Sequence, residues 1–155
     1  MEKINKKQVS IWVDADACPA IIRDIVCRAA QRTQTTAIFV ANKFIRLPQS
    51  PYVNMLQVES GFDVADDTIE QRTGNDDIVI TSDIPLAASV LAKGSFVLTS
   101  RGVQYTKQNI NARLNMRDFM DQLRSSGVDT GGSAPFNHTD RQAFANKLDQ
   151  ILAKI

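Results

Sequence analysis

The chain has 155 residues, of which 43% are hydrophobic, enough for one domain with a sizeable core and too many for a disordered chain. No apolar run is long enough to span a membrane, and the first seven residues lack the apolar stretch of a secretory signal. We therefore expect a cytoplasmic protein without a membrane partner. The two cysteines lack CxxC spacing, which predicts reduced thiols, Cys27 in the core and Cys18 in a structural role.

Short apolar segments alternate with helical patterns along the first hundred residues, which predicts a mostly parallel sheet with helices on both faces. We predict an α/β fold, a single three-layer domain with a five-stranded sheet. The predicted strands are 8–13, 36–40, 55–58, 77–81 and 95–98. The predicted helices between them are 19–31, 63–72 and 85–93.

The last third of the chain loses the strand pattern. Apolar spacing predicts helices over 109–123 and 139–155, the second beginning with a capping box from Thr139 to Gln142. The glycine-rich segment 125–137 between them is a connector or a lid. Residues 1–155 therefore form one domain, with a core over about 8–100 and a helical closure over about 104–155.

Two aspartates follow the first predicted strand. Asp14 and Asp16 lie where an apolar run ends and, after Pro19, a helical pattern begins. In open α/β sheets, ligands bind at the carboxyl ends of the strands, and paired carboxylates suit Mg²⁺ or Mn²⁺. The alternative is that Asp14 ends the strand and Asp16 caps the helix.

Two further acidic elements follow. On a helix Asp63, Asp66, Asp67 and Glu70 share one face, although the helix dipole alone would favour the first two. Asp83 follows the fourth predicted strand, as Asp14 follows the first. We expect the first and fourth strands to be neighbours, which would bring Asp14, Asp16 and Asp83 to one cleft as a divalent-metal site. A capping role for Asp83 stays open.

The net charge of +1 hides an uneven distribution. Residues 59–83 contain eight acids and one base, whereas residues 101–124 contain five bases and two acids. This asymmetry fits an acidic metal centre beside a surface that contacts phosphates. Ordinary solvated helix faces are the alternative.

Several short motifs together cover nearly the whole chain from Ser10 onward. They are Val13–Pro19, Ala41–Asn42 with Arg46–Pro48, Gly61–Asp67, Ile80–Ala87, Asn115–Asp118 and Thr130–Gly132. In these motifs the chain resembles the bacterial YaiI/YqxD family, also called UPF0178 or DUF188. That family in turn resembles PIN-like nucleases, in which an aspartate ends the first strand, an acid lies on a central helix and a Thr-x-Asp ends the fourth strand.

The resemblance implies a metal-dependent nuclease that hydrolyses phosphodiester bonds, with RNA as the expected partner and Mg²⁺ or Mn²⁺ as cofactor. The catalytic positions that match are Asp14, Asp67 and Asp83. Asp16 departs from the PIN pattern, and Asp63 or Asp66 could replace Asp67. The expected metal ligands are Asp14, Asp16, Asp66, Asp67 and Asp83.

Nucleic-acid contacts are expected from basic and aromatic side chains. Phe44 and Tyr105 are candidate stacking platforms, although Phe44 could instead belong to the core and Arg117 could pair with Asp118 or Asp121. The candidates for phosphate contacts are Lys43, Arg46, Arg101 and Arg117.

Two other functions stay open. The spacing of Asp14 and Asp16 also resembles haloacid-dehalogenase-type phosphatases, with Thr81 or Ser82 and Lys93 as phosphate-binding residues. That match lacks the small hydroxylic residue after the pair. The third reading is a non-catalytic RNA-binding module that retains the acidic pocket as a structural metal site.

Overall fold

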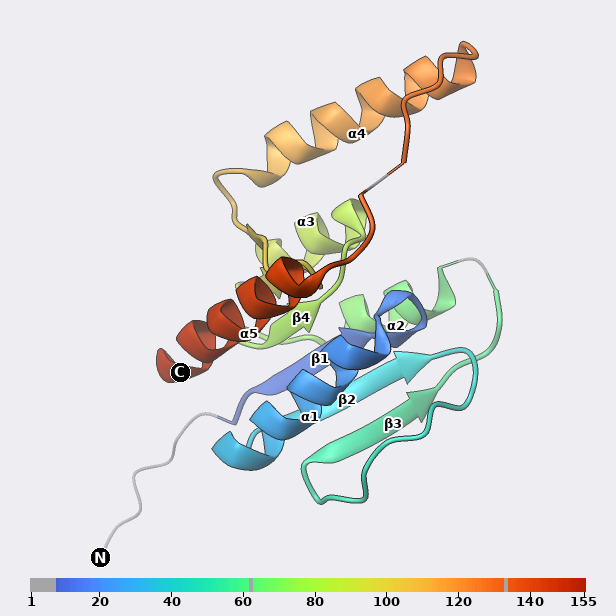
Figure 1. Cartoon of the computed structure of the whole chain (residues 1–155). Helices are drawn as coiled ribbons and strands as arrows, with labels where there is room; N and C mark the ends of the chain where they lie inside the picture. The colour runs from blue at the N-terminus through green and yellow to red at the C-terminus, as the bar shows by residue number, and fades with distance from the viewer. Residues whose placement is uncertain (1–7, 62, 133) are drawn as a thin grey trace, which may run out of the picture.

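Six strands form one sheet in the computed structural model, which describes residues 8–61, 63–132 and 134–155. Their order is β3-β2-β1-β4-β5-β6, and all neighbours are parallel except β5 and β6 (Figure 1). β1 and β4 are therefore adjacent, as the sequence predicted. The strands are β1 (Ser10–Asp14), β2 (Thr36–Ala41), β3 (Val53–Gln57), β4 (Ile78–Ile80), β5 (Phe96–Leu98) and β6 (Gln104–Tyr105).

Helices cover both faces of the sheet, which confirms the three-layer α/β fold. Alternation along β1 separates two cores: Ile11 and Val13 pack with α1 and α5, whereas Trp12 packs with α2 and α3. The helices are the short 3-10 turn η1 (Ala15–Ala17), α1 (Ala20–Thr33), α2 (Val64–Arg72), α3 (Ile84–Ala92), α4 (Ile110–Ser125) and α5 (His138–Ala153).

A buried carboxylate fixes the amino end of the central strand pair. Asp77, just before β4, accepts hydrogen bonds from the backbone N–H of Ser10 (2.9 Å), the indole N–H of Trp12 (3.1 Å) and the backbone N–H of Gly74 (2.8 Å). Two of these donors belong to β1, so one side chain holds β1 in register with β4. The carboxyl ends of the two strands consequently emerge side by side.

Two details differ from the sequence predictions. The sheet has a sixth strand, because Gln104–Tyr105 pairs antiparallel with β5, and two residues are too few to give an alternating pattern. The capping box predicted to start at Thr139 was wrong. Asn137 accepts from the N–H of Asp140 (3.0 Å) and Asp140 accepts from the N–H of Asn137 (3.2 Å). Asparagine caps as well as threonine does, so the N-cap lies two residues earlier than expected and the helix begins at His138.

Both thiols are buried and free, as predicted for structural cysteines. Burial raises the pKa of Cys18 to about 12 and that of Cys27 to about 11. Neither thiol is therefore ionised near neutral pH. Among the helices of the described residues, none has the length and apolar character needed to cross a bilayer.

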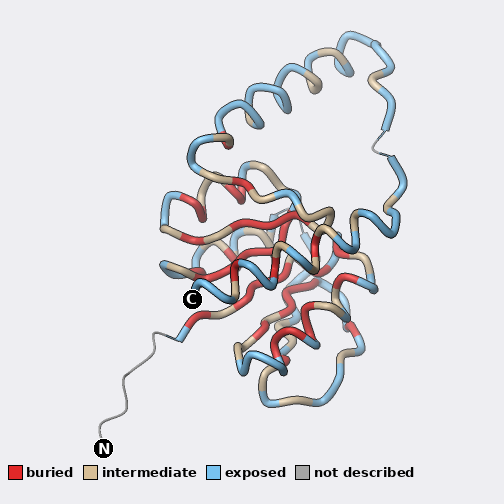
Figure 2. The backbone as a smooth tube through the Cα atoms, turned by 60° about the vertical axis from the view of Figure 1, so that its left-hand side comes forward, coloured by how far each residue is buried: buried red, intermediate tan, exposed pale blue. Residues whose placement is uncertain are grey.

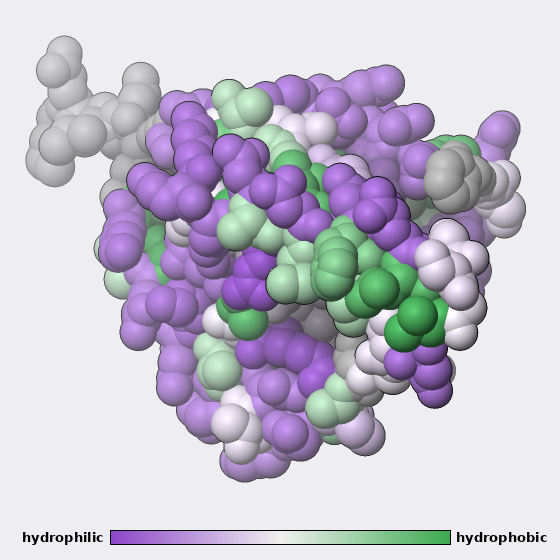
Figure 3. Space-filling model, turned by 90° about the horizontal axis from the view of Figure 1, so that it is seen from above, coloured by the Kyte–Doolittle hydropathy of each residue, from purple (hydrophilic) through white to green (hydrophobic). Residues whose placement is uncertain are grey.

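Helix α4 projects from the body of the molecule. It packs mainly against α3, and only Ile110 at its first position is buried (Figures 1 and 2). Met116 and Phe119 are more than half exposed on its surface. Figure 3, seen from the side on which α4 lies, shows hydrophobic side chains exposed among hydrophilic ones. This helix contributes little to the two cores.

Candidate functional site

Two aspartates lie at the carboxyl edge of the central strand pair. Asp14 is the last residue of β1, and Asp83 follows β4 by three residues and is the N-cap of α3. The strand order reverses direction between β1 and β4, which is where open α/β sheets form their ligand crevice. The chain topology therefore brings together the two strand-end acids that the sequence singled out.

Thr81 connects these two aspartates. Its hydroxyl donates a hydrogen bond to Oδ2 of Asp14 (3.1 Å) and accepts one from the backbone N–H of Asp83 (3.0 Å). Thr81 is only 4% exposed, so both bonds lie in a protected environment. Asp83 also accepts from the N–H of Leu86 (2.8 Å), which confirms the capping role and leaves its second carboxylate oxygen for other contacts.

Helix α2 supplies the third acid of the cluster. Asp66 is half-buried and its carboxyl group hydrogen-bonds to that of Asp83, whereas Asp67 is exposed. Desolvation by burial, the hydrogen bond to Asp83 and the charges of Asp83, Asp14 and Asp63 raise the pKa of Asp66 to about 7. Asp66, rather than Asp67, is therefore the mid-chain acid that faces both strand-end aspartates.

Burial and charge act on Asp14 in the same direction. Desolvation raises the pKa of Asp14, the hydrogen bond from Thr81 opposes this, and the charges of Asp83 and Asp16 add to the increase. Carboxylates this close repel each other unless a proton or a cation lies between them. The cluster of Asp14, Asp66 and Asp83, called the acidic triad below, has this property.

Asp16 lies beside the triad but has a different partner. It is exposed on η1, and its Oδ2 accepts the backbone N–H of Asn42 at 2.8 Å. Asn42 follows β2, so this bond ties η1 to the start of the loop between β2 and β3. The sequence marked Asn42 only as part of a motif of the family resemblance, and its side chain gave no sign of this bond because the donor is a backbone group.

The acids line two neighbouring hollows. One, of about 110 Å³, is bordered by Asp16, Asn42, Asp63 and Asp66. The other, of about 330 Å³, is bordered by Asp66, Asp67, Glu70, Asp83 and Arg117, among others. Asp63 and Asp66 border both hollows. A third and much smaller hollow beside Asp14 includes Thr81 and Ser100. Ser100 follows β5 at the same edge, and only its place after a strand could have marked it.

The donor set suits a hard divalent cation. The triad offers carboxylate oxygens only, and Mg²⁺ is usually held by one or two carboxylates together with waters and substrate phosphates. Within the described ranges, no three His, Cys, Asp or Glu side chains form a ready-made ligand set. Asp66 and Asp83 instead hydrogen-bond to each other, so at least one of them must lose a proton before both can bind a metal.

The four basic candidates differ in their surroundings. Arg101 donates to Oδ2 of Asp140 (3.0 Å) and to the carbonyl of Ala134, so its guanidinium links the segment after β5 to the start of α5. Arg117 pairs with Asp118 (3.4 Å) and Asp121 (3.7 Å) but also borders the larger acidic hollow. Lys43 and Arg46 are exposed, and neither pairs with any other residue of the described ranges.

The two candidate stacking platforms, Tyr105 and Phe44, differ in exposure. Tyr105 is 8% exposed in the core, with the Arg113 guanidinium 5.5 Å from its ring centre, so it has no free face to offer a base. Phe44 is 76% exposed, so it does not belong to the core.

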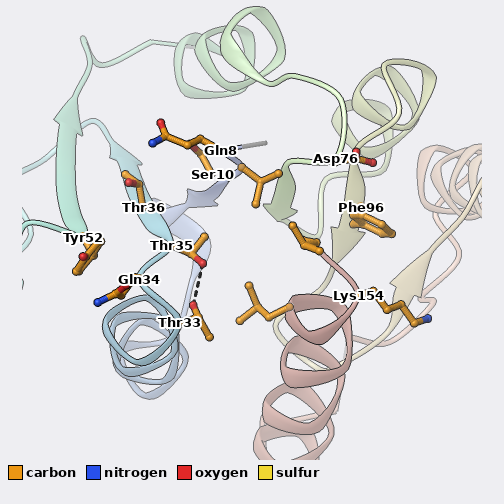
Figure 4. Close-up of a pocket in the computed structure, with 13 residues that line it drawn as sticks. Gln8, Ser10, Thr33, Gln34, Thr35, Thr36, Tyr52, Asp76, Phe96 and Lys154 are labelled. Atoms are coloured by element: carbon orange, nitrogen blue, oxygen red, sulfur yellow. Dashed lines mark hydrogen bonds between the residues drawn. The ribbon is translucent and has the colours of Figure 1, made fainter. Parts of the chain in front are cut away.

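A cavity without such a cluster of acids lies at the opposite edge of the sheet. It has a volume of about 610 Å³ and lies beside the ends of α1 and α5 (Figure 4). Its polar lining is mainly hydroxyl groups, such as those of Ser10, Thr33, Thr35 and Tyr52, and the hydroxyls of Thr33 and Thr35 hydrogen-bond to each other at 2.8 Å. Among the described residues that line this cavity, Asp76 has the only acidic side chain, whereas several acidic side chains border the smaller hollows.

Lys93, which a phosphatase would need near Asp14, lies elsewhere. It follows the last residue of α3 and its ammonium group donates to the carbonyl of Glu70. The nine residues of α3 lie between Lys93 and Asp83, which places the two residues about 15 Å apart along the helix axis. A phosphatase site built on Asp14 would therefore lack this cation.

Comparison with known proteins extends the likeness over the whole chain. Residues 12–154 match the model of DUF188, described as the uncharacterised YaiI/YqxD family. The UPF0178 protein of Thioalkalivibrio sulfidiphilus is 58% identical over 146 residues, covering 94% of this chain and 99% of its own length. The UPF0178 protein of Alkalilimnicola ehrlichii is 59% identical over 144 residues, covering 93% of this chain and 97% of its own.

A third relative is similar to this chain over nearly its whole length. The UPF0178 protein of Shewanella amazonensis is 54% identical over 147 residues, covering 95% of this chain and 99% of its own. No solved structure matches the fold significantly. On the family model and these relatives, the chain belongs to the uncharacterised YaiI/YqxD family.

Proposed function

We propose that the protein is a divalent-metal-dependent nuclease that hydrolyses phosphodiester bonds of RNA in the cytoplasm. The observation that carries the proposal is the meeting of Asp14, Asp66 and Asp83 at the reversal point of the strand order. Burial and the charges of neighbouring carboxylates raise the pKa of Asp66 and of Asp14, an arrangement that favours binding of a cation. The two buried free thiols fit the reducing conditions of the cytoplasm.

Asp14 and Asp83 would hold Mg²⁺ or Mn²⁺, with Asp66 completing the set and Asp16 and Asp67 at its margin. When bound, such an ion activates water and stabilises charge on the phosphate oxygens. The relatively low exposure of Asp14 favours this role, because charge interactions strengthen where water is excluded.

The surrounding residues orient these carboxylates. Thr81 fixes one oxygen of Asp14, and the N–H of Leu86 fixes one oxygen of Asp83, so both side chains are held before substrate arrives. Because its pKa is raised to about 7, Asp66 is protonated in a fraction of the molecules near neutral pH, and it can lose that proton when positive charge enters the cluster.

The experiment is a cleavage assay with single-stranded and duplex RNA in the presence of Mn²⁺ or Mg²⁺. The wild type should cleave, and Asp14→Asn and Asp83→Asn should each abolish cleavage. Asparagine at position 83 keeps the cap on α3, so loss of activity would not reflect loss of the helix. Asp149→Asn, an exposed change on α5, is the control that should cleave normally.

Other results of this assay would instead support the binding module or the phosphatase. A protein that binds RNA but never cleaves it with either metal is a binding module. One that hydrolyses small phosphomonoesters through an aspartyl-phosphate on Asp14 is a phosphatase. Wild-type cleavage by the Asp83→Asn variant would exclude the acidic triad as the nuclease site.

A further inference from the structure

The loop between β2 and β3 begins at Asn42, on the rim of the smaller acidic hollow, and presents an exposed aromatic ring two residues later. Phe44 has the most exposed of the large hydrophobic side chains among the described residues, at 76%. Its neighbours Lys43 and Arg46 are exposed too, and neither has a partner within the described ranges. The contacts among the described residues therefore give no role in stabilising the fold to this exposed ring or to the two cations that flank it in sequence.

This ring is held outward by a well-anchored backbone. The N–H of Asn42 binds Oδ2 of Asp16 (2.8 Å), and the N–H of Ile45 lies 3.3 Å from the sulfur of Met55 on β3. Ile45 is 7% exposed and belongs to the core between α1 and the sheet. Because the residues on both sides of Lys43 and Phe44 are fixed, the loop presents these side chains with a smaller entropic cost than a free loop would.

The loop also borders the smaller acidic hollow. The hollow of about 110 Å³ has Asn42 and Asp16 on one side and Asp63 and Asp66 on the other. On the far side of the loop, Arg46 borders a second hollow of about 290 Å³, next to Arg23 at the start of α1. The segment from Asn42 to Arg46 therefore connects the acidic hollow to a hollow that Arg23 and Arg46 border together with Asp24.

We propose that Phe44 stacks on an unpaired base of a single-stranded nucleic acid, while Lys43 and Arg46 contact the neighbouring phosphates. The inference rests on the proposed function, because the nucleic-acid strand bound by Phe44 would be the one that the acidic triad cleaves. An aromatic ring can stack on any base whose face is free, whereas the bases of a duplex already stack on one another. The platform thus selects single strands by their accessible bases and does not read sequence.

The test measures binding of a fluorescently labelled single-stranded RNA of about ten nucleotides, and of its duplex, in EDTA. The wild type should prefer the single strand. Phe44→Ala should weaken single-strand binding about fivefold or more, and Phe44→Trp should restore it. Lys43→Ala and Arg46→Ala should each lower the salt dependence by about one counter-ion.

Phe119→Ala is the matched control, because Phe119 is also an exposed phenylalanine but lies on α4, and this change should leave binding unaltered. Equal binding of single strand and duplex, or unchanged binding of Phe44→Ala, would overturn the platform even if the wild type cleaves RNA. Conversely, binding that depends on Phe44 in a protein that never cleaves would support the platform and reject the nuclease.

Discussion

The hydroxyl of Thr81 donates a hydrogen bond to Oδ2 of Asp14 across the central strand pair, at 3.1 Å. The hydroxyl oxygen of Thr81 also accepts a hydrogen bond from the backbone N–H of Asp83 at 3.0 Å. One threonine therefore sets the relative position of the two strand-end aspartates. Its position at the end of β4 makes this possible, because β1 and β4 are paired in parallel one residue before.

Thr81→Val should therefore disturb stability and the site together. Valine has the same shape but leaves the partly buried N–H of Asp83 and one oxygen of Asp14 without their partner, which should cost about 1 to 3 kcal/mol. Urea denaturation followed by the fluorescence of Trp12, the single tryptophan, measures the change. Thr81→Ser retains the hydroxyl and should lose much less. Equal stabilities for the two variants would mean that the hydrogen bonds are not formed in solution.

The pKa of Asp66 predicts how stability depends on pH. Its folded-state pKa of about 7 lies above the ordinary 3.8, so between these values the folded chain keeps a proton that the unfolded chain has lost. The contribution of Asp66 is fully present below about pH 3.8 and is lost as pH rises toward 7. One carboxyl group gives at most about 1.4 kcal/mol per pH unit, and partial exposure of Asp66 makes the slope smaller.

Comparison with Asp66→Asn isolates this contribution, because asparagine does not titrate. The free energy of unfolding of the wild type minus that of Asp66→Asn, measured in EDTA, should decrease from pH 4 to 7 and level off above it. A difference that stays constant, or that rises with pH, would show that Asp66 is not held near its partners.

Divalent metal should stabilise the fold by binding to the triad. At about 100 times the dissociation constant, Mn²⁺ should add about 2.7 kcal/mol, or roughly 5 to 10 °C in Tm for a chain of this size. Asp14→Asn should remove the shift and raise Tm in EDTA, because it relieves repulsion from Asp83 and Asp16. Asp149→Asn should shift like the wild type. A lower Tm of Asp14→Asn in EDTA would instead indicate that the carboxylate has a structural role.

Gly102 should tolerate no side chain. It has φ +84, and an added Cβ would lie 2.5 Å from the backbone of Ala143 on α5. Gly102→Ala should cost about 3 kcal/mol, from backbone strain together with overpacking. Gly127 has φ +87 but open space around it, so Gly127→Ala should show the strain alone, about 1 kcal/mol. Thermal denaturation compares the pair. Equal losses would mean that α5 does not pack against Gly102.

The sequence by itself determined the layers and the strand-end acids. Apolar runs of strand length and helical spacing are local properties, and they predicted strands covered by helices on both faces. In the structure the two-residue period of β1 divides its side chains between the two cores. The same local reasoning placed Asp14 and Asp83 at strand ends. It missed β6, because two residues carry no period, and it misplaced the cap of α5, because asparagine and threonine cap a helix about equally well.

Only the tertiary structure decided which acids meet. Helical spacing puts Asp63, Asp66, Asp67 and Glu70 on one face, but the rotation of α2 against the sheet turns Asp66 toward Asp83 and leaves Asp67 exposed. Likewise, no local pattern fixes whether Phe44 or its neighbour Ile45 is buried. The loop places Ile45 in the core and Phe44 outside. Such choices depend on contacts between elements far apart in the chain, and a local pattern does not contain them.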